Sequence, residues 1–173
     1  MTVFLCYNTY GSDDMNIVIR KLKENEYQVL EDFLYEAIFI PEGIEKPSKD
    51  IIKNKELQVY IKNFGMKDDN CLVALDNNKI IGACWSRIMN DYGHIDDNTP
   101  SLAISLYEEY RSKGIGTKLM TEMQKLLKEK GYQKTSLAVQ KKNYAVNMYK
   151  KVGFKIIDEN EEEYIMLCDL KEK

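Results

Sequence analysis

The chain has 173 residues, of which 44% are hydrophobic, 31% charged and 10% aromatic. These proportions are typical of a globular protein and exclude a disordered, collagenous or low-complexity chain, while the length suits one domain with its own core. The formal net charge of −3 provides no bulk attraction to nucleic acid, so we expect no nucleic-acid partner.

The first residues differ in character from the rest. Residues 1–14 are polar and show no hydrophobic period, which predicts a loosely ordered leader followed by a single domain over residues 15–171. The start lacks the basic and apolar regions of a signal peptide, and the longest near-apolar run, residues 80–85, is too short to cross a membrane. We therefore expect no membrane partner.

Hydrophobic periods predict an α/β fold. In chain order we expect a strand at 16–21, a helix at 25–40, one or two short helices at 49–64, strands at 71–75 and 79–89, a polar loop or two edge strands at 90–99, a strand at 101–106, a helix at 114–130, a strand at 135–139, a helix opening at Asn143, and strands at 154–157 and 164–170. The β-α-β unit over 101–139 should be a right-handed parallel crossover, whereas the hairpins are antiparallel. The expected architecture is a mixed sheet of about six to seven strands with helices on both faces.

The cysteines indicate the redox environment. The four of them, at positions 6, 71, 84 and 168, are widely spaced and share no C-x-x-C pattern. This spacing argues against a disulfide framework and against a cysteine zinc site, so we predict a cytoplasmic protein that holds no metal. His94 is the only histidine, which excludes any mechanism that needs two.

Charge is distributed unevenly along the chain. Residues 111–155 contain twelve Lys or Arg against two acids, whereas residues 1–110 and 156–173 are both acidic. One face for an anion and another for a cation would explain this pattern, and so would two lysine-rich helices that merely face solvent.

The segment from Arg111 to Thr117 lies where an expected strand ends and a long helix begins. A helix N-terminus leaves backbone N–H groups unpaired and carries about half a positive charge, and Gly114 and Gly116 would let an anion approach the backbone. The pattern predicts either a phosphate cradle or a tight turn that binds nothing. A P-loop does not fit because no glycine stands at the required distance before Gly116, and a dinucleotide fingerprint does not fit because Leu119 replaces its third glycine.

Two runs together resemble a known family. The run from Arg111 to Gly116 reads R-x-x-G-x-G, and the run from Asn143 to Phe154 contains an alanine, a tyrosine and a final Gly-Phe pair on a predicted helix. With the strand that precedes the first run, these motifs are similar to those of the GNAT acetyltransferase superfamily. The resemblance covers roughly residues 17–170 and extends to the order of the elements.

The resemblance implies that acetyl-CoA binds in a cleft where two parallel strands splay apart. The main chain of the strand at 101–106 would bond the pantetheine arm, the glycine turn would hold the pyrophosphate, and Tyr149 would face the thioester sulfur. The implied cofactor-binding residues are Ile104, Ser105, Leu106, Arg111, Ser112, Lys113, Gly114, Ile115, Gly116, Thr117 and Asn143. Without the resemblance, Tyr149 would be interpreted as a core aromatic residue and Asn143 as a helix N-cap.

The implied activity is N-acetyl transfer to a primary amine of a small molecule or peptide, by a monomer or homodimer. Tyr149 can protonate the departing thiolate. A lysine-like amine, with a pKa of about 10.4, is neutral in only about 4 parts in 10,000 at pH 7 and needs a base. His94 is the candidate catalytic base, and Asp96 and Glu42 are alternative candidates for this role. The resemblance implies that the acidic loops containing these residues face the acceptor.

Three alternatives remain open at this stage. The first is a domain that binds acyl-CoA as a sensor or scaffold without turnover. The second is an enzyme that acetylates protein N-termini or lysines, which would need an open groove. The third is a nucleotide-binding module of another class, which the missing third glycine disfavours.

Overall fold

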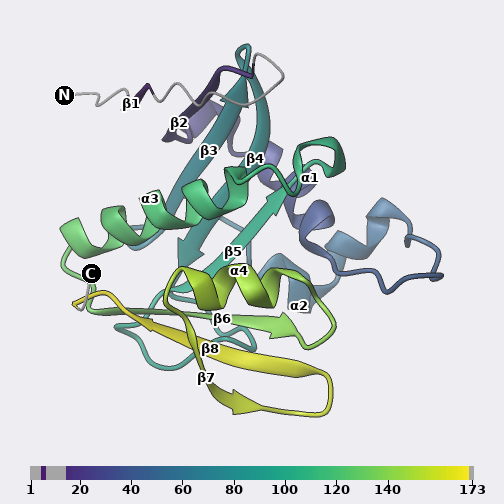
Figure 1. Cartoon of the computed structure of the whole chain (residues 1–173), viewed down its shortest axis with the longest axis vertical. Helices are drawn as coiled ribbons and strands as arrows, with labels where there is room; N and C mark the ends of the chain where they lie inside the picture. The colour runs from purple at the N-terminus through teal and green to yellow at the C-terminus, as the bar shows by residue number, and fades with distance from the viewer. Residues whose placement is uncertain (1–4, 7–14, 172–173) are drawn as a thin grey trace.

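The structure, a computed structural model, describes residues 5–6 and 15–171 (Figure 1). Their eight strands form one sheet in the spatial order β1-β2-β3-β4-β5-β6-β8-β7. The strands are β1 (Leu5–Cys6), β2 (Ile17–Lys21), β3 (Asn70–Asp76), β4 (Lys79–Arg87), β5 (Ser101–Leu106), β6 (Lys134–Gln140), β7 (Lys155–Glu159) and β8 (Glu163–Asp169). Only β5 and β6 are parallel neighbours, so the predicted mixed sheet is confirmed.

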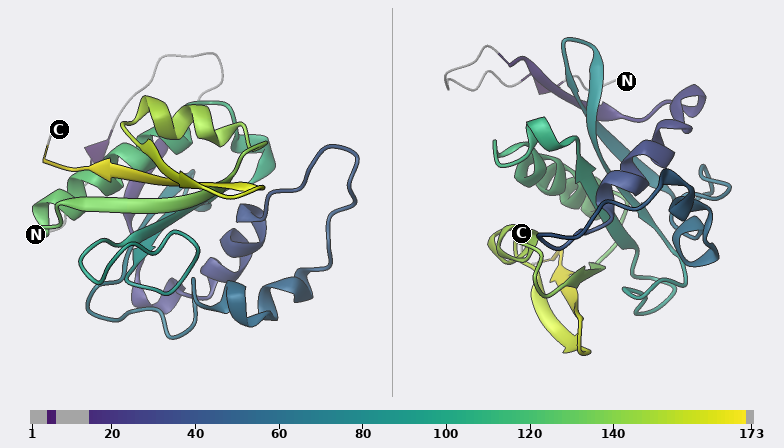
Figure 2. Two further views of the ribbon diagram at one scale, coloured as in Figure 1. Left: turned by 90° about the horizontal axis from the view of Figure 1, so that it is seen from below. Right: turned by 90° about the vertical axis from the view of Figure 1, so that its right-hand side faces the viewer.

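Four helices cover the two faces of this sheet. Figure 2 shows α1 (Val29–Ala37) and α2 (Lys55–Gln58) on one face, and α3 (Ile115–Glu129) and α4 (Ala145–Lys151) on the other. Three 3-10 turns lie between these elements: η1 (Glu24–Glu26) precedes α1, η2 (Lys49–Lys53) lies between α1 and α2, and η3 (Glu108–Tyr110) lies between β5 and α3. Among the described residues, no helix combines the length and the apolar character needed to cross a membrane.

The sheet separates two hydrophobic cores. In β3, Leu72 and Ala74 pack into the core beneath α3 and α4, while Cys71 and Val73 pack into the core beneath α1. Successive side chains of a strand point to opposite faces, so a strand covered on both faces must be apolar at nearly every position. This explains the continuous apolar run predicted as a strand at 71–75.

The first helix is shorter than its hydrophobic period predicts. Of the stripe at 25–40 only α1 is α-helical, and η1 precedes it. The Glu26 carboxylate bonds both Arg20 and the backbone N–H of Lys23, and these bonds keep η1 separate from α1. At the other end Ile38 is already extended. The residues at 90–99 contain no strand and form a loop, which settles the alternative left open by the sequence.

The predicted leader at 1–14 lies mostly outside the described residues. Its described part, β1, pairs antiparallel with β2, with Leu5 opposite Ile19 and Cys6 opposite Val18.

The parallel pair is the feature that positions a site. β5 and β6 are in register at one position only, Ser101 opposite Ser136, at the start of both strands. Beyond it the two strands separate, and β6 pairs along its whole length with β8 instead. The sheet is therefore joined at one end of β5 and open at the other.

Candidate active site

A cleft of about 1040 Å³ lies where β5 and β6 separate. Both faces of the sheet contribute to it, since residues of α1, α2 and the loop at 38–48 line one side and residues of α3 and α4 line the other. Ten of the predicted site residues line this cleft: Ile104, Ser105, Leu106, Arg111, Ser112, Gly114, Gly116, Thr117, Asn143 and Tyr149.

The edge of β5 that faces the cleft has unpaired main-chain groups. An antiparallel ladder directs alternate residues toward one neighbour and the rest toward the other. The Tyr107 N–H bonds Ile81 of β4, whereas the Pro100 carbonyl accepts from Ser136 of β6, which fixes the alternation. The even-numbered residues of β5 therefore face β6. Leu102 lies at the paired end, and the Leu106 carbonyl accepts from Arg111, but the N–H groups of Ile104 and Leu106 and the Ile104 carbonyl face the cleft. An extended amide-containing chain could add itself to this edge as a strand would.

The glycine turn has the geometry of an anion cradle. Gly114 is the N-cap of α3 with φ of 80°, and Ser112 also has a positive φ, of 59°. A Cβ built on Gly114 meets no atom within 4 Å, so the backbone there is open toward the cleft. Within the described residues, the backbone N–H groups of 112–117 make no hydrogen bond to the chain. They remain available to an anion at the positive end of the helix.

Arg111 lines the cleft and is paired within the chain. Its guanidinium donates to the Leu106 carbonyl (3.0 Å), to the Glu36 carbonyl (3.3 Å) and to the Glu36 carboxylate (2.8 Å). These bonds fasten the end of β5 to the last turn of α1, whose carbonyls would otherwise lack partners. Arg111 therefore links the glycine turn to the end of β5 and to α1.

Tyr149 lines the cleft from α4, and Asn143 lines it from the residues just before α4. Tyr149 is 92% buried, its ring packs edge-on against Phe154, and burial raises its pKa well above the usual phenol range. Its hydroxyl makes no hydrogen bond to another described residue, so it is a protonated donor free to serve a ligand. The side-chain oxygen of Asn143 accepts from the N–H of Ala145, the first residue of α4 (2.9 Å), which leaves its side-chain NH₂ for the cleft.

Three predicted residues do not line the cleft. Lys113 is exposed beside the Tyr110 ring, and Ile115 is buried in the core, so only its backbone can serve the cradle. His94 lies in the loop at 88–100 with its Nε2 3.9 Å from the Asp97 carboxylate. Asp96, another candidate base, also lies outside the cleft, whereas Glu42 lines it.

The sequence analysis missed several residues that line the cleft. Tyr60 and Tyr92 contribute aromatic rings, and Glu56 and Glu163 contribute carboxylates that join Glu42 there. Tyr60 lies just past α2, in a segment with little hydrophobic period, so no local pattern pointed to it. The two cations in the lining, Lys46 and Arg111, both pair with Glu36, at 3.0 and 2.8 Å. Two further acids, Glu36 and Glu108, also line the cleft. Within the described chain Glu36 is paired, whereas Glu42, Glu56 and Glu163, and Glu108 beside the cradle, have no ion-pair partner.

Comparisons with known proteins agree with this geometry. The family described as "Acetyltransferase (GNAT) domain" matches residues 30–168. The spermidine N(1)-acetyltransferase of Thermoplasma acidophilum is 28% identical over 161 residues, which cover 88% of this chain and 96% of that protein. The crystal structure of the PaiA N-acetyltransferase of the same organism in complex with coenzyme A superposes with a TM-score of 0.62 and 28% identity, covering 90% and 99% of the two chains.

A more distant structure shares the fold. The ribosomal-protein-S18-alanine N-acetyltransferase of Escherichia coli has a TM-score of 0.63 at 16% identity, covering 89% of this chain and 94% of that chain.

Proposed function

Because this chain belongs to the GNAT acetyltransferase family and is therefore an N-acetyltransferase, we propose that it acetylates a primary amine of a small polyamine such as spermidine. The observation that carries this proposal is the set of unpaired carboxylates, Glu42, Glu56 and Glu163, in one cleft with Tyr60 and Tyr92. Carboxylates in a partly enclosed cleft raise the local concentration of a cation and orient it, and aromatic faces attract ammonium groups.

The cofactor half of the cleft fits acetyl-CoA. The open backbone at Gly114, the free N–H groups of 112–117 and the unpaired edge of β5 would hold a pyrophosphate followed by an amide-containing arm. Acetyl-CoA, when bound, supplies an activated acetyl thioester. The overall similarity of this chain, at 28% identity, to an N-acetyltransferase whose structure contains coenzyme A supports the same assignment.

The protein's own groups supply the rest of the chemistry. The N–H groups of Ile104 and Leu106, which face the cleft beyond the paired end of β5, can bond a carbonyl oxygen on which negative charge develops. Tyr149 holds its proton because of burial, and it can give that proton to sulfur as the thiolate leaves.

The proposal also includes a cytoplasmic location and a small-molecule acceptor. Among the described residues, three cysteines are buried free thiols: Cys71, Cys84 and Cys168. Free thiols are consistent with a reducing cytoplasm. A small-molecule acceptor for a monomer or homodimer remains our prediction.

The test is a thiol-release assay of the purified chain with acetyl-CoA and a panel of amines. The panel contains spermidine, spermine, a diamine, free lysine and peptides with a free N-terminus or a lysine. We expect the highest kcat/KM with a polyamine. Faster turnover of a peptide would replace the proposal by protein acetylation, and acetyl-CoA binding without turnover of any amine would replace it by a sensor function.

A further inference from the structure

The joined end of the parallel pair holds a partly buried carboxylate, Asp91. One oxygen of Asp91 accepts from the Ser101 hydroxyl (2.9 Å) and the other accepts from the Tyr60 hydroxyl (3.2 Å). Ser101 and Ser136 stand 3.3 Å apart where β5 meets β6, and Ser136 donates to the Gly93 carbonyl (2.6 Å). Asp91 therefore lies at the joined end of β5 and β6, in contact with Tyr60, which lines the cleft.

The packing of the loop at this point is tight. A Cβ on Gly93 would come within 2.9 Å of the Ala138 nitrogen of β6. Only a glycine allows the loop that carries Asp91 to approach the strand pair so closely.

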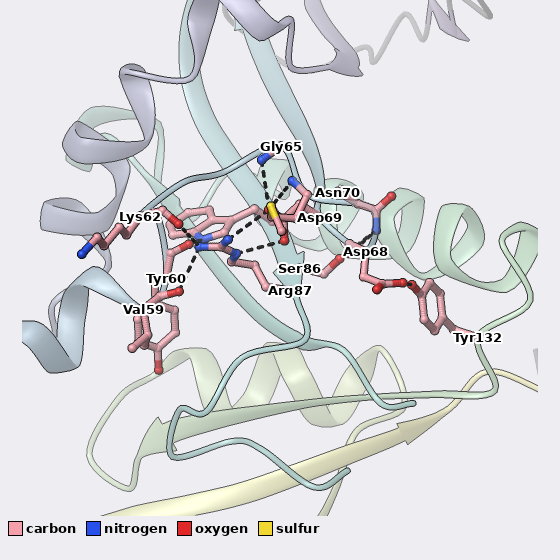
Figure 3. A network of polar contacts seen from close by, with 12 residues as sticks. Val59, Tyr60, Lys62, Gly65, Asp68, Asp69, Asn70, Ser86, Arg87 and Tyr132 are labelled. Atoms are coloured by element: carbon pink, nitrogen blue, oxygen red, sulfur yellow. Dashed lines mark hydrogen bonds and ion pairs between the residues drawn. The ribbon is translucent and has the colours of Figure 1, made fainter. Parts of the chain in front are cut away.

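A separate network holds Tyr60 in place. Trp85 donates from its indole to the Tyr60 carbonyl (3.1 Å). Arg87, in a buried ion pair with Asp69 (3.0 Å), donates to the carbonyls of Val59 (3.0 Å) and Lys62 (2.9 Å). Figure 3 shows the Tyr60 ring projecting away from this network. The backbone is thus anchored to β4 on one side while the ring reaches the cleft on the other.

The surroundings of Tyr60 and Asp91 favour the protonated forms of both groups. The other ionisable groups that face Tyr60 are Glu163 of β8 and Tyr92, and none of them is basic. Within the described part of the chain, no Lys, Arg or His side chain pairs with Asp91, whose partners are neutral. Burial raises the pKa of Asp91 and, together with the Asp91 charge, that of Tyr60. The phenol stays protonated and the carboxylate becomes a stronger base than usual.

We infer that Tyr60 and Asp91 form the proton-accepting pair for the incoming amine, with Tyr60 in contact with the acceptor and Asp91 acting through it. This inference rests on the proposed acceptor being a strongly basic primary amine. The Tyr60 oxygen takes a proton from the ammonium nitrogen while its own proton passes to Asp91, so that R–NH₃⁺ and a carboxylate become R–NH₂ and a carboxylic acid. Tyr60 is neutral before and after.

The remaining bonds and protons balance. The amine lone pair forms the C–N bond to the acetyl carbon as the C–S bond breaks, and sulfur takes a proton from Tyr149. The nitrogen releases its second proton to water, water reprotonates Tyr149, and Asp91 returns its proton to water. The net change is one proton released for each amide formed.

The other candidate bases are less well placed. His94 and Asp96 lie outside the cleft, and the Asp96 carboxylate accepts from the Asn98 N–H (2.8 Å). Glu42 lines the cleft but is exposed on the loop at 38–48, and it makes no hydrogen bond to another described residue that could pass a proton on.

The experiment compares Tyr60→Phe and Asp91→Asn with Tyr132→Phe as a matched control. Tyr132 also donates to an aspartate, Asp68 (2.5 Å), but away from the cleft (Figure 3). Rates are measured with the best amine of the panel at saturating acetyl-CoA, near pH 7 and near pH 9.5. Acetyl-CoA affinity is measured alongside as a check on folding.

We expect both cleft variants to lose roughly 10²-fold in kcat/KM near pH 7, as for a general base. Near pH 9.5 the neutral fraction of an amine with a pKa of about 10.4 is about 300-fold larger than at pH 7, so the deficit should shrink below roughly tenfold. The control should match the wild type at both pH values. A deficit that is equal at both pH values, or that the control shares, would overturn the inference.

The outcome is separable from that of the proposed function. If polyamines fail but another amine is turned over, the comparison runs unchanged with that amine. If no amine is turned over, a carbon-13 titration of the aspartate carboxyls, assigned with Asp91→Asn, decides the matter. A carboxyl of Asp91 that titrates at the ordinary aspartate value, or that Tyr60→Phe leaves unchanged, would overturn the inference without any turnover.

Discussion

Arg111 and Glu36 form an ion pair of 2.8 Å that joins the glycine turn to the last turn of α1. Glu36 also pairs with Lys46 (3.0 Å), so one carboxylate connects the cofactor half of the cleft with the loop at 38–48. The guanidinium lies beside the cradle but its charge is already satisfied. Changes at Glu36 should therefore affect both the stability of α1 and the affinity of the cradle for an anion.

Glu36→Gln should strengthen acetyl-CoA binding while it lowers the melting temperature. The substitution frees the Arg111 charge for a phosphate and removes a pair of the kind worth up to about 1 kcal/mol, so affinity should rise roughly 1.5- to 5-fold. Calorimetric titration at low salt measures this. Glu122→Gln, which removes an exposed pair with Lys125 on α3 (2.7 Å), changes net charge equally and should leave the affinity unaltered. Unchanged affinity in Glu36→Gln would mean that Arg111 serves only as a link.

Gly114→Ala should weaken acetyl-CoA binding by at least about tenfold. Gly114 and Gly131 both have positive φ, 80° and 91°, and at both an added Cβ meets open space. Alanine at either position should therefore lower stability by a similar amount, about 1 kcal/mol, because a left-handed backbone disfavours a side chain. Only Gly114 borders the cleft, so only its variant should lose affinity. Equal affinity in the two variants would show that the turn binds no anion.

Tyr149→Phe should lower kcat by roughly 10- to 100-fold and leave acetyl-CoA affinity nearly unchanged. Phenylalanine keeps the ring that packs on Phe154, but it removes the proton donor, and water can replace part of its effect because a thiol pKa of about 8.5 makes the leaving group moderately stable. Steady-state kinetics with a working acceptor measures the change, which belongs in kcat because the proton is given as the C–S bond breaks. A wild-type kcat would return Tyr149 to a packing role.

Glu163→Gln should raise KM for a polyamine several-fold with little change in kcat. The carboxylate attracts the distal ammonium groups equally before and during the reaction, so its loss removes uniform binding. The effect should shrink as salt increases, because ions screen the attraction. Glu161→Gln is the matched control, since Glu161 is a nearby exposed acid that does not line the cleft. A KM that the control raises equally would indicate a general field and no specific site.

Asp91→Asn should stabilise the protein more near pH 7 than near pH 4. Burial raises the pKa of this carboxyl in the folded state, so the folded protein binds the proton more tightly than the unfolded chain does. Stability from this group is therefore present below the unfolded aspartate value, about 3.9, and is lost as pH rises through the raised pKa. The asparagine variant escapes this loss, and its melting temperature relative to the wild type should rise by a few degrees between the two pH values. A constant difference would contradict the raised pKa.

Local sequence patterns predicted most of the fold and the position of the glycine turn, whereas the cofactor-binding role of that turn was implied by the family resemblance. The strand at 71–75 and the place of the glycines at 114 and 116 between a strand and a helix were predictable, because both follow from periods and turn chemistry within a few residues. The limits of α1 were different. Its period continued to Ile40, but the ion pair of Glu26 and the extended backbone at Ile38 shorten the helix at both ends.

The acceptor half depended on the tertiary structure. Tyr60 and Asp91 are 31 residues apart and no period links them, yet they meet because the loop containing Gly93 packs against the joined end of β5 and β6. His94 was chosen for its residue type, but the same packing turns the adjacent Asp91 inward and leaves His94 outside the cleft. A local pattern specifies which groups a segment carries, whereas the direction in which a loop side chain points is set by contacts with strands distant in sequence.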